Sequence, residues 1–80
     1  MKIVSEIQKS RRELVRITLD SYKGHEICDI RVHYEKEPGI WLPGPKGITF
    51  STRFLCQISA ALQEAESVLN IRNQKQVVKT

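Results

Sequence analysis

The spacing of apolar residues along this chain changes once, near residue 51, from a period of two to a helical period. Apolar residues alternate with polar ones between residues 13 and 34, and after residue 51 they recur at intervals of three and four. Alternation places successive side chains on opposite faces of a strand, whereas the longer spacing places them on one side of a helix. The chain is therefore predicted to be an α+β domain in which the strands come first.

Two alternating runs predict an antiparallel hairpin. Val15, Ile17 and Leu19 share one face of the first strand, and a second alternating run begins at Ile27. Residues 21–24 lie between the runs and end in a glycine, which accepts the positive φ angle of a tight turn. Two strands joined by a short glycine-containing turn form a hairpin.

Two short β-prone segments, residues 40–42 and 48–50, are predicted as the third and fourth strands. The prolines and glycines of residues 43–47 exclude a helix between them and suit a rigid turn. A serine or threonine at residues 51–52 can cap the helix that follows, which is predicted for residues 52–69 with a wide apolar stripe that covers one face of the sheet. The predicted fold is a four-stranded antiparallel sheet followed by one C-terminal amphipathic helix (ββββα).

The segments on either side of the predicted domain, residues 13–69, are weakly patterned. Residues 1–12 are predicted to be a basic N-terminal arm or a short helix, and residues 70–80 a flexible basic tail. Both cysteines are predicted to be reduced thiols. Cys28 falls among the core positions, whereas Cys56 lies nearly opposite the apolar stripe of the helix, so we expect Cys56 to be less buried.

Composition excludes several classes of function. No apolar run approaches the roughly 18 residues of a membrane span, and no secretory leader is recognisable. We expect an intracellular protein, cytoplasmic and nucleoid-associated if bacterial and nuclear if eukaryotic. No metal-ligand spacing and no catalytic arrangement of side chains is present, so no metal, no cofactor and no enzymatic activity are predicted. The net charge of +4 suits a nucleic acid, an anionic surface or an acidic protein partner.

Cations and aromatic residues are interleaved along the sheet. The face that the helix leaves open is predicted to carry Arg16, Thr18, Arg31 and His33, with Lys23, His25 and Lys46 on the turns. Cations that neutralise phosphates, mixed with rings that stack on unpaired bases, are typical of single-strand binding. The guanidinium of Arg31 is available either for phosphate or for an ion pair with Asp29 or Glu35. Both histidines are predicted to be surface residues, and Trp41 is predicted to be a core residue.

Three ordered elements carry a family resemblance. These elements are Tyr22-Lys23-Gly24, then Asp29-Ile30-Arg31 with Tyr34, then the Pro-Gly-Pro-Lys-Gly-Ile-Thr-Phe run of residues 43–50. Over residues 13–69 the chain resembles the transcriptional coactivator family known as positive cofactor four. The resemblance implies a curved four-stranded sheet followed by a helix, paired into a two-fold homodimer. It also implies that the two sheets form channels for single-stranded DNA.

The resemblance further implies which residues bind. The implied nucleic-acid-binding residues are Tyr22, Lys23, His25, Arg31, Tyr34 and Lys46. Lys23, Arg31 and Lys46 correspond to the phosphate-binding cations of the family. His25 and Pro45 stand where members often carry lysine or arginine, which predicts weaker and more salt-sensitive binding. The acidic, serine-rich N-terminal segment of eukaryotic members is absent, which favours a minimal bacterial or phage version.

The predicted function is sequence-tolerant binding of single-stranded DNA, in transcription regulation or DNA maintenance. The sequence does not separate DNA from RNA as the ligand, and the resemblance adds the transcription machinery as a partner. The alternative is a protein-interaction module whose basic sheet face binds an acidic partner. In that case the aromatic residues are core residues rather than stacking platforms.

Overall fold

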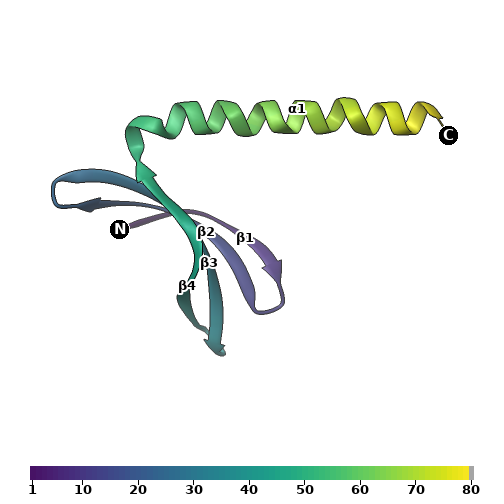
Figure 1. Ribbon diagram of the computed structural model, residues 1–80. Helices are drawn as coiled ribbons and strands as arrows, with labels where there is room; N and C mark the ends of the chain where they lie inside the picture. Colours follow the sequence, from purple (N-terminus) through teal and green to yellow (C-terminus); the bar gives the residue numbers. More distant parts are fainter. Residues whose placement is uncertain (80) are drawn as a thin grey trace.

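One antiparallel sheet and one long helix make up the chain. The computed structural model describes the backbone of residues 1–79 and the side chains of residues 1–72. The sheet has the order β1-β2-β3-β4 (Figure 1). Its elements are β1 (Lys2–Ser10), β2 (Glu13–Tyr22), β3 (His25–Glu37) and β4 (Ile40–Ser51), followed by a 3-10 turn η1 (Thr52–Phe54) and helix α1 (Leu55–Lys79). This arrangement confirms the predicted ββββα fold.

The first strand occupies the segment predicted to be a short helix or a basic arm. Lys2–Ser10 pairs with β2 along its whole length, so that expectation is wrong. The pairing register shifts twice, and each bulge turns the residues that follow onto the other face of the strand. Ile3, Val4 and Ile7 therefore show no period of two. All of β1 is exposed, so burial imposes no regular pattern on it.

The last two predicted strands are parts of a single strand. β4 is continuous, and residues 43–47 form a bulge in it instead of a turn. Its pairing with β3 passes from Arg31↔Gly47 to His33↔Pro43, so β4 advances four residues while β3 advances two. Prolines are tolerated here because β4 is an edge strand, whose outer N–H groups have no partner to lose.

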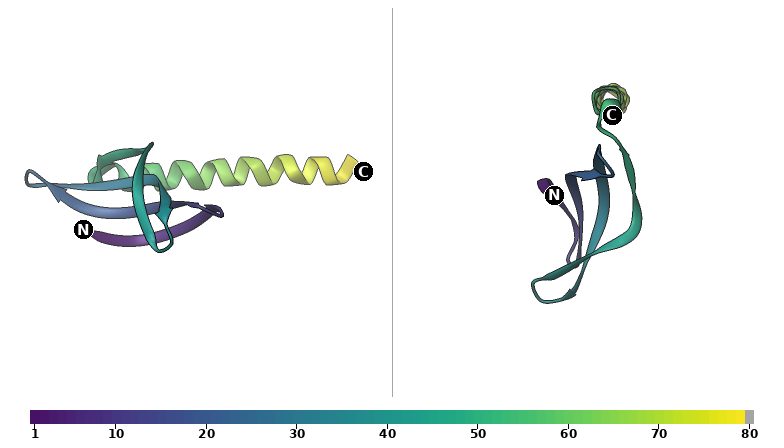
Figure 2. Two further views of the ribbon diagram at one scale, coloured as in Figure 1. Left: turned by 90° about the horizontal axis from the view of Figure 1, so that it is seen from below. Right: turned by 90° about the vertical axis from the view of Figure 1, so that its left-hand side faces the viewer.

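The apolar face of the sheet stays open in the single chain. Figure 2 shows α1 lying outside the sheet and extending past it. Ile17 and Ile30 on the sheet face Ile58 and Leu62 on the helix across an open gap. The radius of gyration is 16.3 Å, whereas a compact chain of this length has about 12 Å. The helix therefore does not cover the sheet as the sequence pattern predicts.

The helix begins close to where it was expected and ends later. The side chain of Ser51 accepts a hydrogen bond from the backbone N–H of Arg53, which confirms a cap at the start of the helical segment. The helical backbone continues beyond residue 69 through residue 79, within the predicted tail. Cys28 is buried and Cys56 is exposed, as predicted. No described helix is long and apolar enough to cross a membrane.

Candidate nucleic-acid interface

The β2–β3 hairpin presents an aromatic ring, an ammonium group and an imidazole at one end of the sheet. Lys23 and Gly24 both have positive φ angles, of 52° and 79°, which is the combination of a type I′ turn. This turn sets Tyr22 and His25 directly opposite each other. The Tyr22 side chain is 61% exposed, and the Lys23 Nζ atom lies 5.3 Å from the centre of its ring. The tyrosine is therefore positioned to stack on a base beside a cation.

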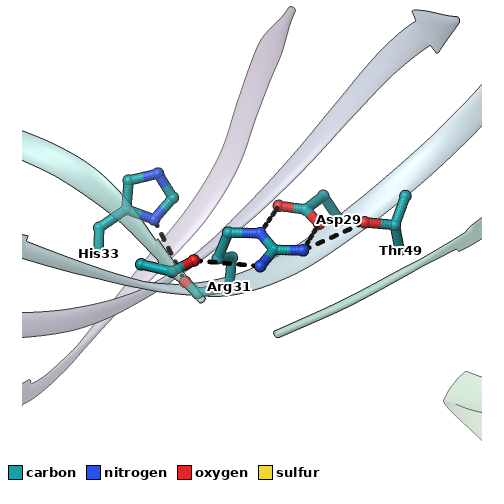
Figure 3. Close-up of polar contacts among 5 residues, drawn as sticks. Asp29, Arg31, His33 and Thr49 are labelled. Carbon is teal, nitrogen blue, oxygen red and sulfur yellow. Dashed lines mark hydrogen bonds and ion pairs between the residues drawn. The ribbon is translucent and has the colours of Figure 1, made fainter. Parts of the chain in front are cut away.

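Arg31 is engaged by neighbouring polar groups near the centre of the sheet (Figure 3). Its Nε and Nη2 atoms each donate to one carboxylate oxygen of Asp29 at 3.1 Å. Its Nη1 atom donates to the Gly44 carbonyl at 3.1 Å, and Nη2 also donates to the Thr49 hydroxyl at 3.4 Å. That hydroxyl donates in turn to Asp29 at 2.5 Å. Of the two roles that the sequence left open, the structure shows the ion pair with Asp29.

Two pKa shifts accompany this cluster. Burial alone would raise the pKa of Asp29, but hydrogen bonds from Thr49 and Arg31, with the positive charge of Arg31, outweigh it and hold the pKa below its ordinary value of 3.8. The neighbouring Cys28 thiol has a raised pKa, first because it is desolvated and second because Asp29 is negative. Asp29 is therefore ionised and Cys28 protonated at neutral pH.

The free energy of unfolding is expected to fall in acid because of Asp29. A carboxyl group whose pKa is lower in the folded state stabilises the fold above its unfolded pKa, and that stability is lost as the pH falls through the folded pKa. The loss should thus develop below about pH 4. Urea unfolding at pH 7 and pH 3 measures it, and the difference between the two pH values should be smaller in Asp29→Asn. An equal difference in both proteins would contradict this account.

The polar face of the sheet carries fewer free cations than predicted. Arg16 pairs with Glu6 at 2.6 Å, and its side chain is only 16% exposed. Thr18 and His33, expected on an open surface, are buried. These residues lie on the two central strands, where neighbours on both sides enclose them. The interpretation of His33 as a surface residue is therefore wrong.

Lys46 is an exposed cation in the bulge of β4, and it forms no ion pair with the described side chains. The bulge begins where β4 leaves close contact with β3. A Cβ atom on Gly47 would lie 2.6 Å from the Ile30 carbonyl oxygen, so only glycine fits at that point. A Cβ on Gly44 would lie 3.1 Å from the Val32 carbonyl oxygen. The two glycines bracket Lys46 and hold its backbone away from the regular strand path.

Two further aromatic residues, Tyr34 and Trp41, lie nearer the other end of the sheet. Tyr34 pairs with Glu13 and is 42% exposed. It shares a face with Val32, and Arg31 points to the opposite face. Because the apolar face is open, this tyrosine is accessible despite its position in the alternation. Trp41 is half-buried on the edge strand β4, so it is not the core residue that the sequence predicted.

The predicted site residues follow the strands and do not form one cluster. From His25 to Tyr34 the chain runs nine residues along β3, or about 30 Å. Such a length suits a linear polymer more than a small molecule. No group of metal-ligating side chains occurs among the residues described. Sequence reasoning missed the partners of Arg31 at Gly44 and Thr49, because only the register of β4 reveals them.

The four-stranded sheet, the long helix and the Tyr-Lys-Gly hairpin together define a class of small ββββα domains. Residues 9–61 match the family described as Transcriptional Coactivator p15 (PC4). The chain belongs to this family, which confirms the resemblance seen in the sequence. No curated protein sequence matches the chain significantly.

Solved structures agree with this assignment. The crystal structure of a PC4 homologue from Burkholderia pseudomallei superposes with a TM-score of 0.75 at 28% sequence identity, and covers 81% of this chain and 96% of the homologue. A second crystal form gives a TM-score of 0.76 at the same identity, with 81% and 88% covered. The bacteriophage T5 homologue of PC4, implicated in recombination-dependent DNA replication, shares the fold with a TM-score of 0.64 at 20% identity, covering 99% of this chain and 96% of that chain.

Proposed function

We propose that this chain binds single-stranded DNA with little dependence on base sequence. The observation that carries the proposal is the hairpin at residues 22–25, where the exposed ring of Tyr22 lies beside the ammonium group of Lys23. A ring stacks on any unpaired base, and a cation neutralises the adjacent phosphate. A duplex hides the faces of its bases, so the ring would contribute little there. Membership of the PC4 family supports the same ligand.

The proposed binding track continues from the hairpin past Arg31 to Lys46, which adds an exposed cation. Tyr34 adds a second exposed ring, on the opposite face of the sheet from Arg31. Binding should weaken as the salt concentration rises, because each cation that contacts a phosphate adds to the salt dependence.

The proposed binding unit is a homodimer. The single chain leaves the apolar face of its sheet uncovered, and Ile48 and Leu62 are more than half exposed. A small domain with so little of its apolar surface enclosed gains stability by association. A second copy would cover the gap between the sheet and α1 and would set two tracks side by side.

The proposed role is in transcription regulation or DNA maintenance. The phage T5 homologue is implicated in recombination-dependent replication, and the family is described by transcriptional coactivation. Both roles use single strands that are exposed temporarily. Both roles imply a location with the DNA, at the nucleoid of a bacterium or in the nucleus of a eukaryote. The role in transcription also implies contact with the transcription machinery.

Fluorescence anisotropy with labelled oligonucleotides tests the proposed function. We expect tighter binding to single-stranded DNA than to a duplex of the same length, over a salt series. The logarithm of the binding constant should fall with the logarithm of salt concentration by about 0.7 for each phosphate contacted. A single-stranded RNA probe establishes whether the ribose matters. Equal binding to single strands and duplex, or none to either at low salt, would rule the proposal out.

The alternative, a module whose basic sheet face binds an acidic protein, has less support. Arg16 and Arg31 are paired with carboxylates of the same chain. The sheet face is therefore less positive than its sequence indicates. On the proposed track the cations without an ion pair among the described residues are Lys23 on the hairpin and Lys46 in the bulge. Lys23 lies beside the exposed ring of Tyr22, which an acidic partner would not require.

A further inference from the structure

We propose that Arg31 is a positioning residue for Lys46, which it holds in place through the bulge of β4, and not a direct phosphate ligand. The inference rests on the proposed binding of single-stranded DNA. It assigns the central arginine a different role from the two lysines of the track.

The guanidinium of Arg31 has little capacity left for a phosphate. An arginine side chain has five N–H donors. One on Nε and one on Nη2 bind Asp29, the second on Nη2 points to Thr49, and one on Nη1 binds Gly44. One N–H on Nη1 remains. The Nε–Nη2 edge, which could bind a phosphate with two bonds, is already occupied by the carboxylate, and on the Nη1–Nη2 edge the Nη2 N–H points to Thr49.

Local charge also opposes a phosphate at this point. Asp29 contacts Arg31 through both carboxylate oxygens, so the pair carries no net charge. An incoming phosphate would meet the carboxylate at nearly the same distance as the guanidinium. The side chains of both residues are about four-fifths covered, which strengthens their interaction relative to that of a pair in open solvent. Displacing the carboxylate would leave a partly buried negative charge without its partner.

The contact with Gly44 connects this pair to Lys46. The Gly44 carbonyl lies at one end of the bulge, and its hydrogen bond to Nη1 runs from the side chain on β3 to the backbone of β4. At the other end, Gly47 sits against Ile30 and Arg31 with no room for a Cβ atom. The segment that carries Lys46 is therefore fixed at both ends, and one attachment is the guanidinium.

Replacing Asp29 by asparagine distinguishes a phosphate ligand from a positioning residue at Arg31, because the two roles predict different changes in the affinity for single-stranded DNA. The substitution removes a negative charge and releases the guanidinium. A direct phosphate ligand would then bind single-stranded DNA as tightly as before or more tightly. A positioning residue would lose its own support, and binding should weaken about fivefold, within the range of coupling inside one hydrogen-bond network. The salt slope should also decrease by about 0.7 as the Lys46 contact is lost.

Further variants complete the experiment. Arg31→Lys keeps the charge but cannot chelate the carboxylate, so it should weaken binding as Asp29→Asn does. Glu64→Gln on the helix raises the net charge equally without touching the network and should leave binding unchanged. In a Lys46→Ala background, Asp29→Asn should have no further effect on affinity. Thr49→Val, which removes one hydroxyl group, replaces Asp29→Asn if that variant unfolds at the assay temperature.

A measurement without DNA makes the inference independent of the binding assay. The backbone amide resonances of Gly44 and Gly47 should shift in Asp29→Asn and Arg31→Lys, and not in Glu64→Gln. Tighter or unchanged DNA binding by Asp29→Asn, additive effects with Lys46→Ala, or unmoved glycine resonances would each overturn the positioning role. Failure of the wild-type protein to bind single strands would instead overturn the proposed function itself.

Discussion

Replacement of Leu62 by glutamate is expected to abolish the proposed dimer. In the single chain Leu62 is 61% exposed, so a monomer would tolerate the change with little loss of stability. A dimer buries two Leu62 side chains, one from each copy. Loss of each buried side chain should weaken association by at least about 2 kcal/mol. Two copies give roughly 4 kcal/mol, or about a thousandfold weaker association. Sedimentation equilibrium measures this directly.

Gln57→Glu is the matched control for the dimer. It adds the same charge five residues earlier, about 140° around the helix from Leu62, and should leave the molecular mass unchanged. If the wild-type protein sediments as a monomer, or if both variants dissociate equally, the apolar stripe of α1 is not the contact. A dimer that survives Leu62→Glu would point to another surface.

Replacement of Tyr22 by alanine is expected to weaken binding to single-stranded DNA while leaving the melting temperature nearly unchanged. The ring is mostly exposed at the end of β2, so little packing is lost with it. Stacking on a base contributes about 1–3 kcal/mol, which corresponds to a loss of about 5-fold to 150-fold in affinity. Fluorescence anisotropy and thermal unfolding on the same samples measure both quantities.

Tyr22→Phe separates stacking from hydrogen bonding by the phenol hydroxyl. It keeps the ring and should retain most of the affinity. The salt slope should be similar in all three proteins, because no phosphate contact is removed. A large fall in melting temperature with no change in DNA binding would instead identify Tyr22 as a structural residue and favour the protein-interaction alternative.

The elements that were predicted correctly from sequence are those whose apolar residues follow one regular period. β2 and the first part of β3 pair without a register shift, so their alternation survives, and the helix retains its three- and four-residue spacing. β1 was missed because it is exposed and its register slips twice. β4 was divided in two because prolines normally end a strand. On an edge strand they are compatible with a bulge.

The candidate site was predicted unevenly for a similar reason. Residues of the tight hairpin depend only on local sequence, so Tyr22 and Lys23 lie at the predicted turn and are exposed at the end of the sheet. The environment of Arg31 depends on long-range pairing. Its contact with Asp29 can be predicted from sequence, because the two residues lie two positions apart on one strand and so share a face. Thr49 and Gly44 become neighbours of Arg31 only through the register of β4.

At residue 23 the left-handed backbone favours glycine or asparagine, whereas the proposed binding favours lysine. A residue with a side chain is strained at its φ of 52°, by about 1 kcal/mol relative to glycine. Asparagine or glycine would suit the turn better but would remove the ammonium group from beside Tyr22. Selection for thermal stability alone would therefore drive this position away from lysine. If Lys23 contacts phosphate as proposed, the fold gives up stability at this position in favour of that binding.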